Sequence, residues 1–163
     1  MTSNHYIIDT SSLIHLNKYN PIDVYPTVWN RMSNLRREGL LHSVIEVYNE
    51  IHRKDDALRQ WTIENRRMFV KETETQMHHV SEILRNYPAL INTEGTFEAD
   101  PWIIAMALEM RSSNQQKLFA EKIIIVTEEK LKGQKVRIPF VCNNYDLDYL
   151  SIFDMFRQEG WQF

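Results

Sequence analysis

Short apolar runs alternate with longer segments of helical spacing along this chain. The runs have the length of buried strands, and they predict strands at residues 6–8, 40–42, 122–127, 138–142 and 161–163. The segments between them place apolar side chains on one side of a helix. They predict helices at residues 10–19, 27–38, 43–54, 76–87, 101–111 and 147–158, with another within 55–69. Ser11 or Ser12 is placed to cap the first helix.

Strands that alternate with helices are typical of a parallel sheet covered by helices. The length of 163 residues suits one domain. We therefore predict a single α/β domain over residues 1–163, with a central parallel sheet of about four to five strands flanked by helices. In such sheets the functional groove lies beyond the carboxyl ends of the strands.

The composition is that of an ordinary globular protein, with 43% hydrophobic and 25% charged residues. A formal net charge of −3 argues against broad non-specific binding to nucleic acid, but it permits an enzyme with one local basic patch. Cys142 is the only cysteine, so no intramolecular disulfide is expected. We recognise no signal peptide and no apolar run of about 20 residues, and we expect a cytoplasmic protein without a membrane span.

Two aspartates stand where a strand ends or a helix begins. Asp9 directly follows the predicted strand at 6–8, where it is either a groove residue or an ordinary turn residue. Asp100 precedes Pro101, a common way to start a helix that needs no chemistry to explain it. The helix behind Asp100 is unusually apolar, which favours a position of this carboxylate near the core.

Two pairs of glutamates compete for further places in the groove. At roughly 100° per residue, Glu50 lies on the flank of the apolar face of helix 43–54, whereas Glu46 points away from that face. We therefore expect Glu50 to reach the groove and Glu46 to be solvated. Glu128 and Glu129 follow the strand at 122–127, either as groove residues or as a solvated acidic turn.

Acids at the ends of several segments would form a cluster in this fold. Clustered carboxylates repel one another and raise each other's pKa, so a fold keeps them together when a cation relieves the repulsion. Oxygen ligands favour Mg²⁺ or Mn²⁺. Zinc is disfavoured because no His/Cys set has ligand spacing, and the adjacent His78 and His79 would face different directions on a helix.

The pattern of acids resembles that of the PIN-domain nucleases, a family that includes the VapC-type toxins of toxin–antitoxin pairs. Two motifs carry most of the resemblance. A hydrophobic strand that ends in Asp, followed by one residue and Ser, reads YIIDTSSLI here and gives Asp9 and Ser11. An Asp that opens an apolar helix reads EADPWIIAMAL here and gives Asp100.

Two shorter motifs add to the resemblance, which extends over residues 6–130. A Glu on the helix after the second strand is matched in HSVIEVYNEI and gives Glu50. A hydrophobic strand followed by Thr, one residue and an acid reads IIIVTEEK and gives Thr127 and Glu129. The usual acid in that motif is Asp. The additional methylene of Glu129 favours an indirect, water-mediated contact with a metal ion.

The resemblance implies a PIN-like fold and a divalent-metal-dependent endoribonuclease that hydrolyses RNA phosphodiester bonds, acting as the toxin of a toxin–antitoxin pair. The catalytic and metal-binding residues it implies are the four acids of these motifs, Asp9, Glu50, Asp100 and Glu129. Ser11 and Thr127 would orient the ligands or water around Mg²⁺ or Mn²⁺. The metal would activate water and stabilise the charge that develops on the phosphate. The implied partners are an RNA substrate and an antitoxin protein.

Four basic residues follow Glu129 near the expected groove: Lys130, Lys132, Lys135 and Arg137. They either bind RNA phosphates or form a solvated basic loop. The apolar stripes of the helices between residues 44 and 87 either pack in the domain core, which we favour, or form a face for a homodimer or an antitoxin.

Other classes of function fit parts of the pattern. A PIN-like domain that has lost catalysis would only bind RNA or a partner, and the presence of Glu129 in place of Asp leaves room for this alternative. A phosphatase of the haloacid-dehalogenase type also begins with an apolar strand and Asp, but it requires a second Asp where Ser11 stands. In a purely structural α/β protein, the acids would lie together by accident.

Overall fold

A parallel β-sheet forms the centre of the molecule in the computed structural model, which describes residues 3–91, 98–114 and 121–163. Within these residues the sheet has five strands in the order β3-β2-β1-β4-β5. The strands are β1 (Asn4–Ile8), β2 (Leu41–Val44), β3 (Phe69–Val70), β4 (Lys122–Val126) and β5 (Asp148–Leu150). The predicted α/β fold with a parallel sheet of four to five strands is confirmed, and the arrangement is consistent with a PIN-like fold.

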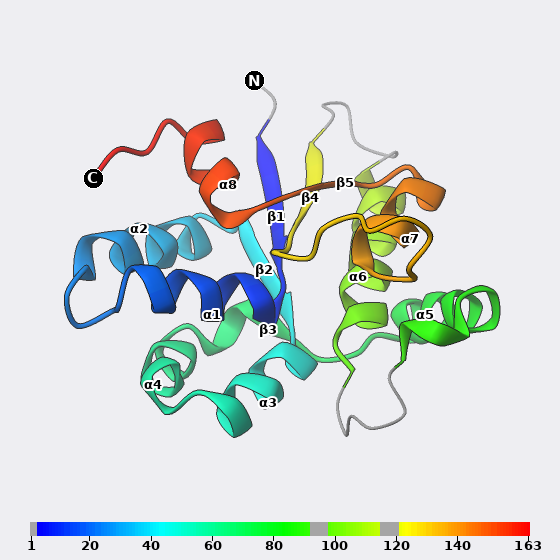
Figure 1. Ribbon diagram of the computed structural model, residues 1–163, viewed down its shortest axis with the longest axis horizontal. Helices are drawn as coiled ribbons and strands as arrows, with labels where there is room; N and C mark the ends of the chain where they lie inside the picture. Colours follow the sequence, from blue (N-terminus) through cyan, green and yellow to red (C-terminus); the bar gives the residue numbers. More distant parts are fainter. Residues whose placement is uncertain (1–2, 92–97, 115–120) are drawn as a thin grey trace.

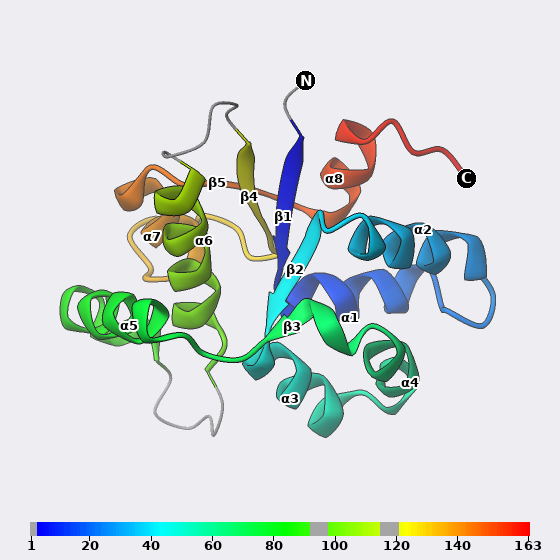
Figure 2. The same cartoon turned by 180° about the vertical axis from the view of Figure 1, so that it is seen from behind.

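Helices cover both faces of the sheet (Figures 1 and 2). Those labelled α1, α2 and α8 lie on one face, and α5, α6 and α7 lie on the other, while α3 and α4 lie towards the carboxyl end of the sheet. Their bounds are α1 (Thr10–Tyr19), α2 (Pro26–Arg37), α3 (Ile45–Lys54), α4 (Asp56–Glu64), α5 (Glu74–Asn86), α6 (Asp100–Asn114), α7 (Ile138–Tyr145) and α8 (Ile152–Gln158). Two short 3₁₀ helices, η1 (Arg66–Met68) and η2 (Pro88–Leu90), complete the described elements.

The register of the strands brings their carboxyl ends to one edge of the sheet. Ile8, the last residue of β1, is paired with Val126, the last residue of β4. In the same way, Val44 at the end of β2 is paired with Val70 at the end of β3. Because all pairs are parallel, the residues that follow these four strands emerge side by side.

The core explains why β1 and β4 are apolar without alternation. Helices cover both faces of these strands, so Ile7, Ile8 and Ile125 have no exposed surface. Helix α6 packs against β1, β2 and β4, and its apolar residues are buried around most of the helix. Within the described residues, no helix has the length and apolar character needed to cross a membrane.

The apolar faces of α3, α4 and α5 are also part of the core. Val47, Leu58, Trp61 and Ile83 are buried within the domain. The rings of Trp61 and Trp29 meet edge to face at 5.2 Å between centroids, which joins α4 to α2. The expectation that the stripes between residues 44 and 87 pack internally is therefore confirmed for these positions.

The prediction of a strand at residues 138–142 is wrong, because this segment begins α7. Pro139 occupies the first turn of the helix, where its lack of an N–H has no cost. The helix ends at Tyr145, and Asp146, the residue that caps it, adopts a left-handed conformation with φ of 55°. A short apolar run is equally compatible with a strand and a buried helix, and the proline was the signal for the helix.

Two very short strands overlap segments that were predicted as helices. Strand β3 follows η1 and begins at Phe69, the last residue of the segment 55–69, and β5 occupies the start of the predicted helix 147–158. Helix α8 begins only after Ser151, whose hydroxyl accepts a hydrogen bond from the backbone N–H of Asp154. Residues 161–163 form no strand. Strands of two or three residues are too short to show a periodicity in the sequence. They form because β3 pairs with β2 and β5 pairs with β4.

The buried position of β4 gives a stability prediction. We expect Ile125→Ala to lower the free energy of unfolding by about 2–5 kcal/mol, because it leaves a cavity between the two helical layers. Ile63→Ala in α4 is the control, since that side chain is 47% exposed and its truncation should cost within about 0.5 kcal/mol. Urea unfolding of both variants measures the difference, and equal losses would contradict this description of the core.

Candidate metal centre

Asp9 is held in one orientation at the end of β1. Its backbone N–H donates to the carbonyl of Val126 at 2.9 Å, which continues the sheet for one residue. Its Oδ1 accepts a hydrogen bond from the N–H of Thr10 at 2.8 Å, so Asp9 caps α1. The prediction that Ser11 or Ser12 caps this helix is therefore wrong.

The second oxygen of Asp9 contacts two hydroxyl groups. Ser11 Oγ donates to Asp9 Oδ2 at 2.9 Å, and Thr127 Oγ1 donates to the same oxygen at 3.2 Å. Thr127 is buried at the end of β4 and also accepts from the N–H of Glu129 at 3.2 Å. The two hydroxyls therefore join the ends of the two central strands and hold the carboxylate of Asp9.

The carboxylate of Glu129 is oriented by α7, the helix at a segment that was predicted to be a strand. Its Oε2 accepts a hydrogen bond from the backbone N–H of Ile138 at 3.0 Å, at the start of α7. The free N–H groups and the dipole of a helix start both favour a carboxylate. The additional methylene of Glu129, compared with Asp, lets one residue contact this helix while it stays beside Asp9.

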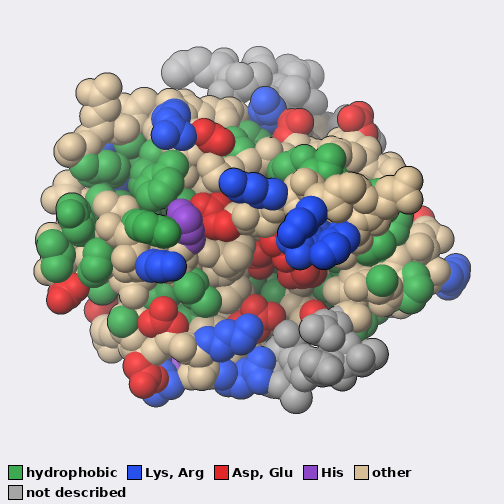
Figure 3. Space-filling view, in the orientation of Figure 1, with side chains coloured by type: hydrophobic (Ala, Val, Ile, Leu, Met, Phe, Trp, Pro, Cys, Tyr) green, Lys and Arg blue, Asp and Glu red, His purple; other side chains and the backbone are tan. Residues whose placement is uncertain are grey.

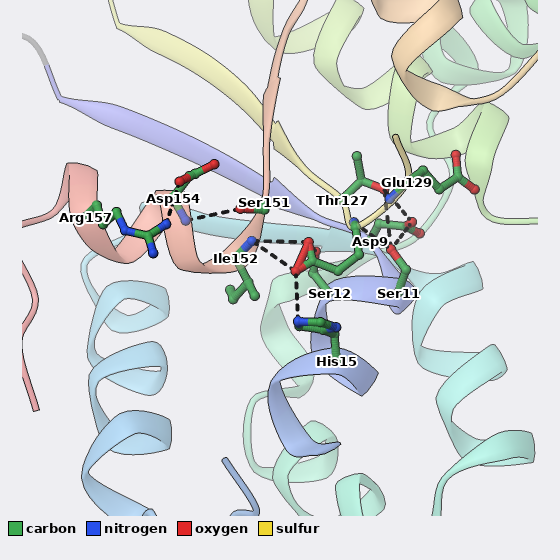
Figure 4. Close-up of polar contacts among 11 residues, drawn as sticks. Asp9, Ser11, Ser12, His15, Thr127, Glu129, Ser151, Ile152, Asp154 and Arg157 are labelled. Atoms are coloured by element: carbon green, nitrogen blue, oxygen red, sulfur yellow. Dashed lines mark hydrogen bonds and ion pairs between the residues drawn. The ribbon is translucent and has the colours of Figure 1, made fainter. Parts of the chain in front are cut away.

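Three carboxylates converge at the carboxyl edge of the sheet. Asp9, Asp100 and Glu129 each offer one oxygen, and these oxygens lie within 4.8 Å of one another. Asp9 comes from the end of β1, Asp100 from the start of α6, and Glu129 from the loop after β4. Figure 4 shows Asp9 and Glu129 side by side, with Ser11 and Thr127 against Asp9. The structure thus brings three of the four predicted acids together.

Glu50 lies beside this cluster, and both of its oxygens accept hydrogen bonds from the chain. Thr10 Oγ1 donates to Oε2 at 2.6 Å, and the backbone N–H of Ala99 donates to Oε1 at 3.2 Å. Glu50 therefore links α3 to the start of α1 and to the residue before Asp100. It is 8% exposed, as its predicted place on the inner flank of the helix requires. In this structure it positions the cluster and is not one of the three converging acids.

Burial and mutual repulsion raise the pKa of two of the acids. The pKa of Asp9 rises to about 6, first because the side chain is buried and then because of the negative charge of Glu129. Its hydrogen bond from Ser11 acts in the opposite direction. The pKa of Asp100 is raised well above its ordinary value by burial, followed by the charges of Asp9, Glu129 and Glu50. The charges of neighbouring acids therefore make Asp9 and Asp100 harder to ionise.

Glu128 points away from the cluster, although it is adjacent to Glu129. Its carboxylate accepts from the N–H of Ile152 at 3.3 Å, at the start of α8, and from Ser12 Oγ at 3.4 Å. His15 Nε2 lies 3.8 Å from the same carboxylate. In Figure 4, Ile152 and His15 lie apart from Ser11 and Asp9. Of the two acids that follow β4, Glu129 is the one that belongs to the candidate centre.

Basic residues border the acidic hollow. Lys130, Lys132 and Lys135 are exposed in the loop between β4 and α7, and Arg137 is half-buried just before α7. In Figure 3, Asp and Glu side chains gather in a hollow near the middle of the face, and Lys and Arg side chains lie around it. His78 and His79 lie on α5 and are not part of the cluster.

The prediction that Glu46 is solvated is wrong, since this side chain is only 7% exposed. The error follows from the missed strand β3, which pairs with β2 and brings the next segment beside the start of α3. Thr10 was not predicted as a site residue, although its hydroxyl donates to Glu50 and its N–H donates to Asp9. Its place directly after the strand-end aspartate was the available signal.

The donor set fits a hard divalent cation. All three converging groups are carboxylates, and burial together with the charges of neighbouring acids raises the pKa of Asp9 and Asp100, an effect that a cation would offset. Within the described residues, no His or Cys joins the cluster, which disfavours zinc. Asp9, Asp100 and Glu129 would hold a metal directly, and Glu50 lies at its edge.

The fold and the site together define an α/β domain with a cluster of three carboxylates, one buried and two half-buried, at the carboxyl edge of a parallel sheet. A family model described as Domain of unknown function (DUF4411) matches residues 6–163. The chain therefore belongs to the DUF4411 family. A search of curated proteins finds no match to this chain.

The raised pKa of Asp9 predicts a pH dependence of stability without metal. A folded-state pKa of about 6 lies above the unfolded value near 3.9, so folding favours the protonated form. This contribution to stability is complete below about pH 4 and is lost as the pH rises through about 6. In EDTA, Asp9→Asn should therefore be more stable than the wild type by about 1–3 kcal/mol at pH 8, and by less at pH 5.

Urea unfolding of the two proteins at both pH values measures this difference. The single oxygen of Asn can keep the cap of α1, and its NH2 group can donate to the hydroxyls of Ser11 and Thr127, which then act as acceptors. The variant therefore removes the charge while the side chain keeps its shape and its polar contacts. An identical pH dependence in the two proteins would show that Asp9 is not under electrostatic strain.

Proposed function

We propose that this protein is a divalent-metal-dependent endoribonuclease that hydrolyses RNA phosphodiester bonds, with Mg²⁺ or Mn²⁺ as cofactor. The observation that carries the proposal is the convergence of Asp9, Asp100 and Glu129, which come from distant parts of the sequence, within 4.8 Å. Nothing in the packing of the core requires three acids to meet at this place. Bringing three acids together costs free energy because they repel one another, and a bound cation would offset that repulsion.

The chain supplies orientation and charge. Thr10, Ser11 and Thr127 fix the carboxylate of Asp9, and the N–H of Ile138 fixes that of Glu129. Ligands held in this way need little rearrangement when a cation binds. Burial and the charges of Asp9, Glu129 and Glu50 raise the pKa of Asp100, and a bound cation would lower it again. A bound Mg²⁺ or Mn²⁺ would supply an activated water and stabilise charge on the phosphate.

The basic loop supports a polyanionic substrate. Lys130, Lys132 and Lys135 are exposed close to Glu129 in the chain, and phosphates approaching the acids would pass near them. The choice of RNA rests on the resemblance of the motifs to those of PIN-domain nucleases. From the same resemblance we propose a role as a toxin with an antitoxin partner, acting on RNA in the cytoplasm.

Removal of one ligand tests the catalytic role. We expect Asp100→Asn to lower the rate of Mn²⁺-dependent RNA cleavage by about 10³-fold or more, because a well-placed cation contributes several kcal/mol to the transition state. The same variant should remain folded, because it replaces an acid with a raised pKa by a neutral amide of the same shape. Cleavage of a labelled RNA in Mn²⁺ and in EDTA measures the effect.

Glu128→Gln is the matched control for this experiment. Glu128 follows the same strand as Glu129 but points away from the cluster. The amide oxygen of Gln could still accept the hydrogen bond from the N–H of Ile152, so cleavage should be retained. Cleavage by Asp100→Asn at the wild-type rate would overturn the proposed site. Mn²⁺-dependent thermal stabilisation of the wild type without any cleavage would instead favour a binding module that has lost catalysis.

A further inference from the structure

A second pair of carboxylates lies at the same edge of the sheet, beyond Glu50. Val44 and Val70 are paired at the ends of β2 and β3, and each strand is followed two residues later by a glutamate. The parallel register therefore brings Glu46 and Glu72 to the same level. Glu46 is buried whereas Glu72 is exposed, and the two carboxyl groups are close enough to shift each other's pKa.

The environment of Glu46 is unusual for an acid. Its side chain is 7% exposed, and its Oε2 is buried without a hydrogen-bond partner. Within the described part of the chain, neither Glu46 nor Glu72 forms an ion pair with Lys or Arg. A buried carboxylate oxygen without a donor is costly, and such groups in native proteins commonly mark an ion or water.

The two glutamates shift each other's pKa in opposite directions. The pKa of Glu46 is raised to about 8, first by burial and then by its hydrogen bond with Glu72, with the charges of Glu72 and Glu50 adding to the effect. The pKa of Glu72 is lowered, mainly by the same hydrogen bond. Two carboxylates in contact require either a proton or a cation between them.

A proton shared between the two groups engages only one oxygen of each carboxyl group and adds no further donor. Among the described residues, no donor contacts the buried Oε2 of Glu46. A hydrated divalent cation would bind both carboxylates, and its water ligands would donate to the remaining oxygen. Mg²⁺ sites in proteins commonly consist of one or two carboxylates and several waters.

We propose that Glu46 and Glu72 form a second site for a hard divalent cation, Mg²⁺ or Mn²⁺, separate from the cluster of Asp9, Asp100 and Glu129. The site ties the start of α3 to the segment between β3 and α5. It also places positive charge near Glu50, on the flank of the acidic hollow, where it lowers the repulsion of an approaching phosphate. The proposal does not rest on the nuclease activity.

Counting bound Mn²⁺ tests this site directly. We expect the wild-type chain to bind one more Mn²⁺ than the Glu46→Gln variant, measured from the remaining free Mn²⁺ by electron paramagnetic resonance at about pH 8. Glu72→Gln should lose the same ion. Asp9→Asn should lose the ion of the first cluster and keep this one, so failure of either site is recognised separately.

Glu74→Gln is the matched control, because Glu74 is an exposed acid in the first turn of α5, two residues from Glu72. It should bind as many Mn²⁺ ions as the wild type. Equal Mn²⁺ binding by Glu46→Gln and the wild type would overturn the proposal and leave a shared proton as the link between the two acids. Circular dichroism of the metal-free variants checks their fold, and Glu46→Gln should be tolerated because it removes a buried charge.

Discussion

Repulsion between carboxylates at one edge of the sheet is the constraint on which the rest of this structure depends. Parallel strands with matched ends deliver Asp9 and Glu129 to the same place, and α6 adds Asp100. Burial makes each charge more costly, and the pKa values of Asp9 and Asp100 record that cost. The surrounding structure must therefore supply donors that hold the acids in place.

Those donors come from elements that also build the fold. The start of α1 binds Asp9, the start of α7 binds Glu129, and the residue before α6 binds Glu50. Helix starts carry free N–H groups and a partial positive charge, so they stabilise carboxylates without neutralising them. The cluster remains negative overall, and this is the property that a divalent cation requires.

The sequence predicted the parts of this architecture that have strong periodicity or a distinctive local pattern. The buried runs of β1 and β4, the apolar helix after Asp100 and the convergence of Asp9 with Asp100 and Glu129 all followed from such signals. It did not predict β3, β5 or α7, because those elements depend on pairing, on a proline and on a contact with Glu129. The missed β3 is also why Glu46 was expected in solvent.

Diffraction from crystals soaked in Mn²⁺, recorded with anomalous scattering, tests the central claim most directly. We expect an anomalous peak coordinated by oxygens of Asp9, Asp100 and Glu129, with Glu50 at its edge. A structure in which Mn²⁺ binds elsewhere, while these three carboxylates stay together without an ion, would contradict the proposal that they form a metal centre.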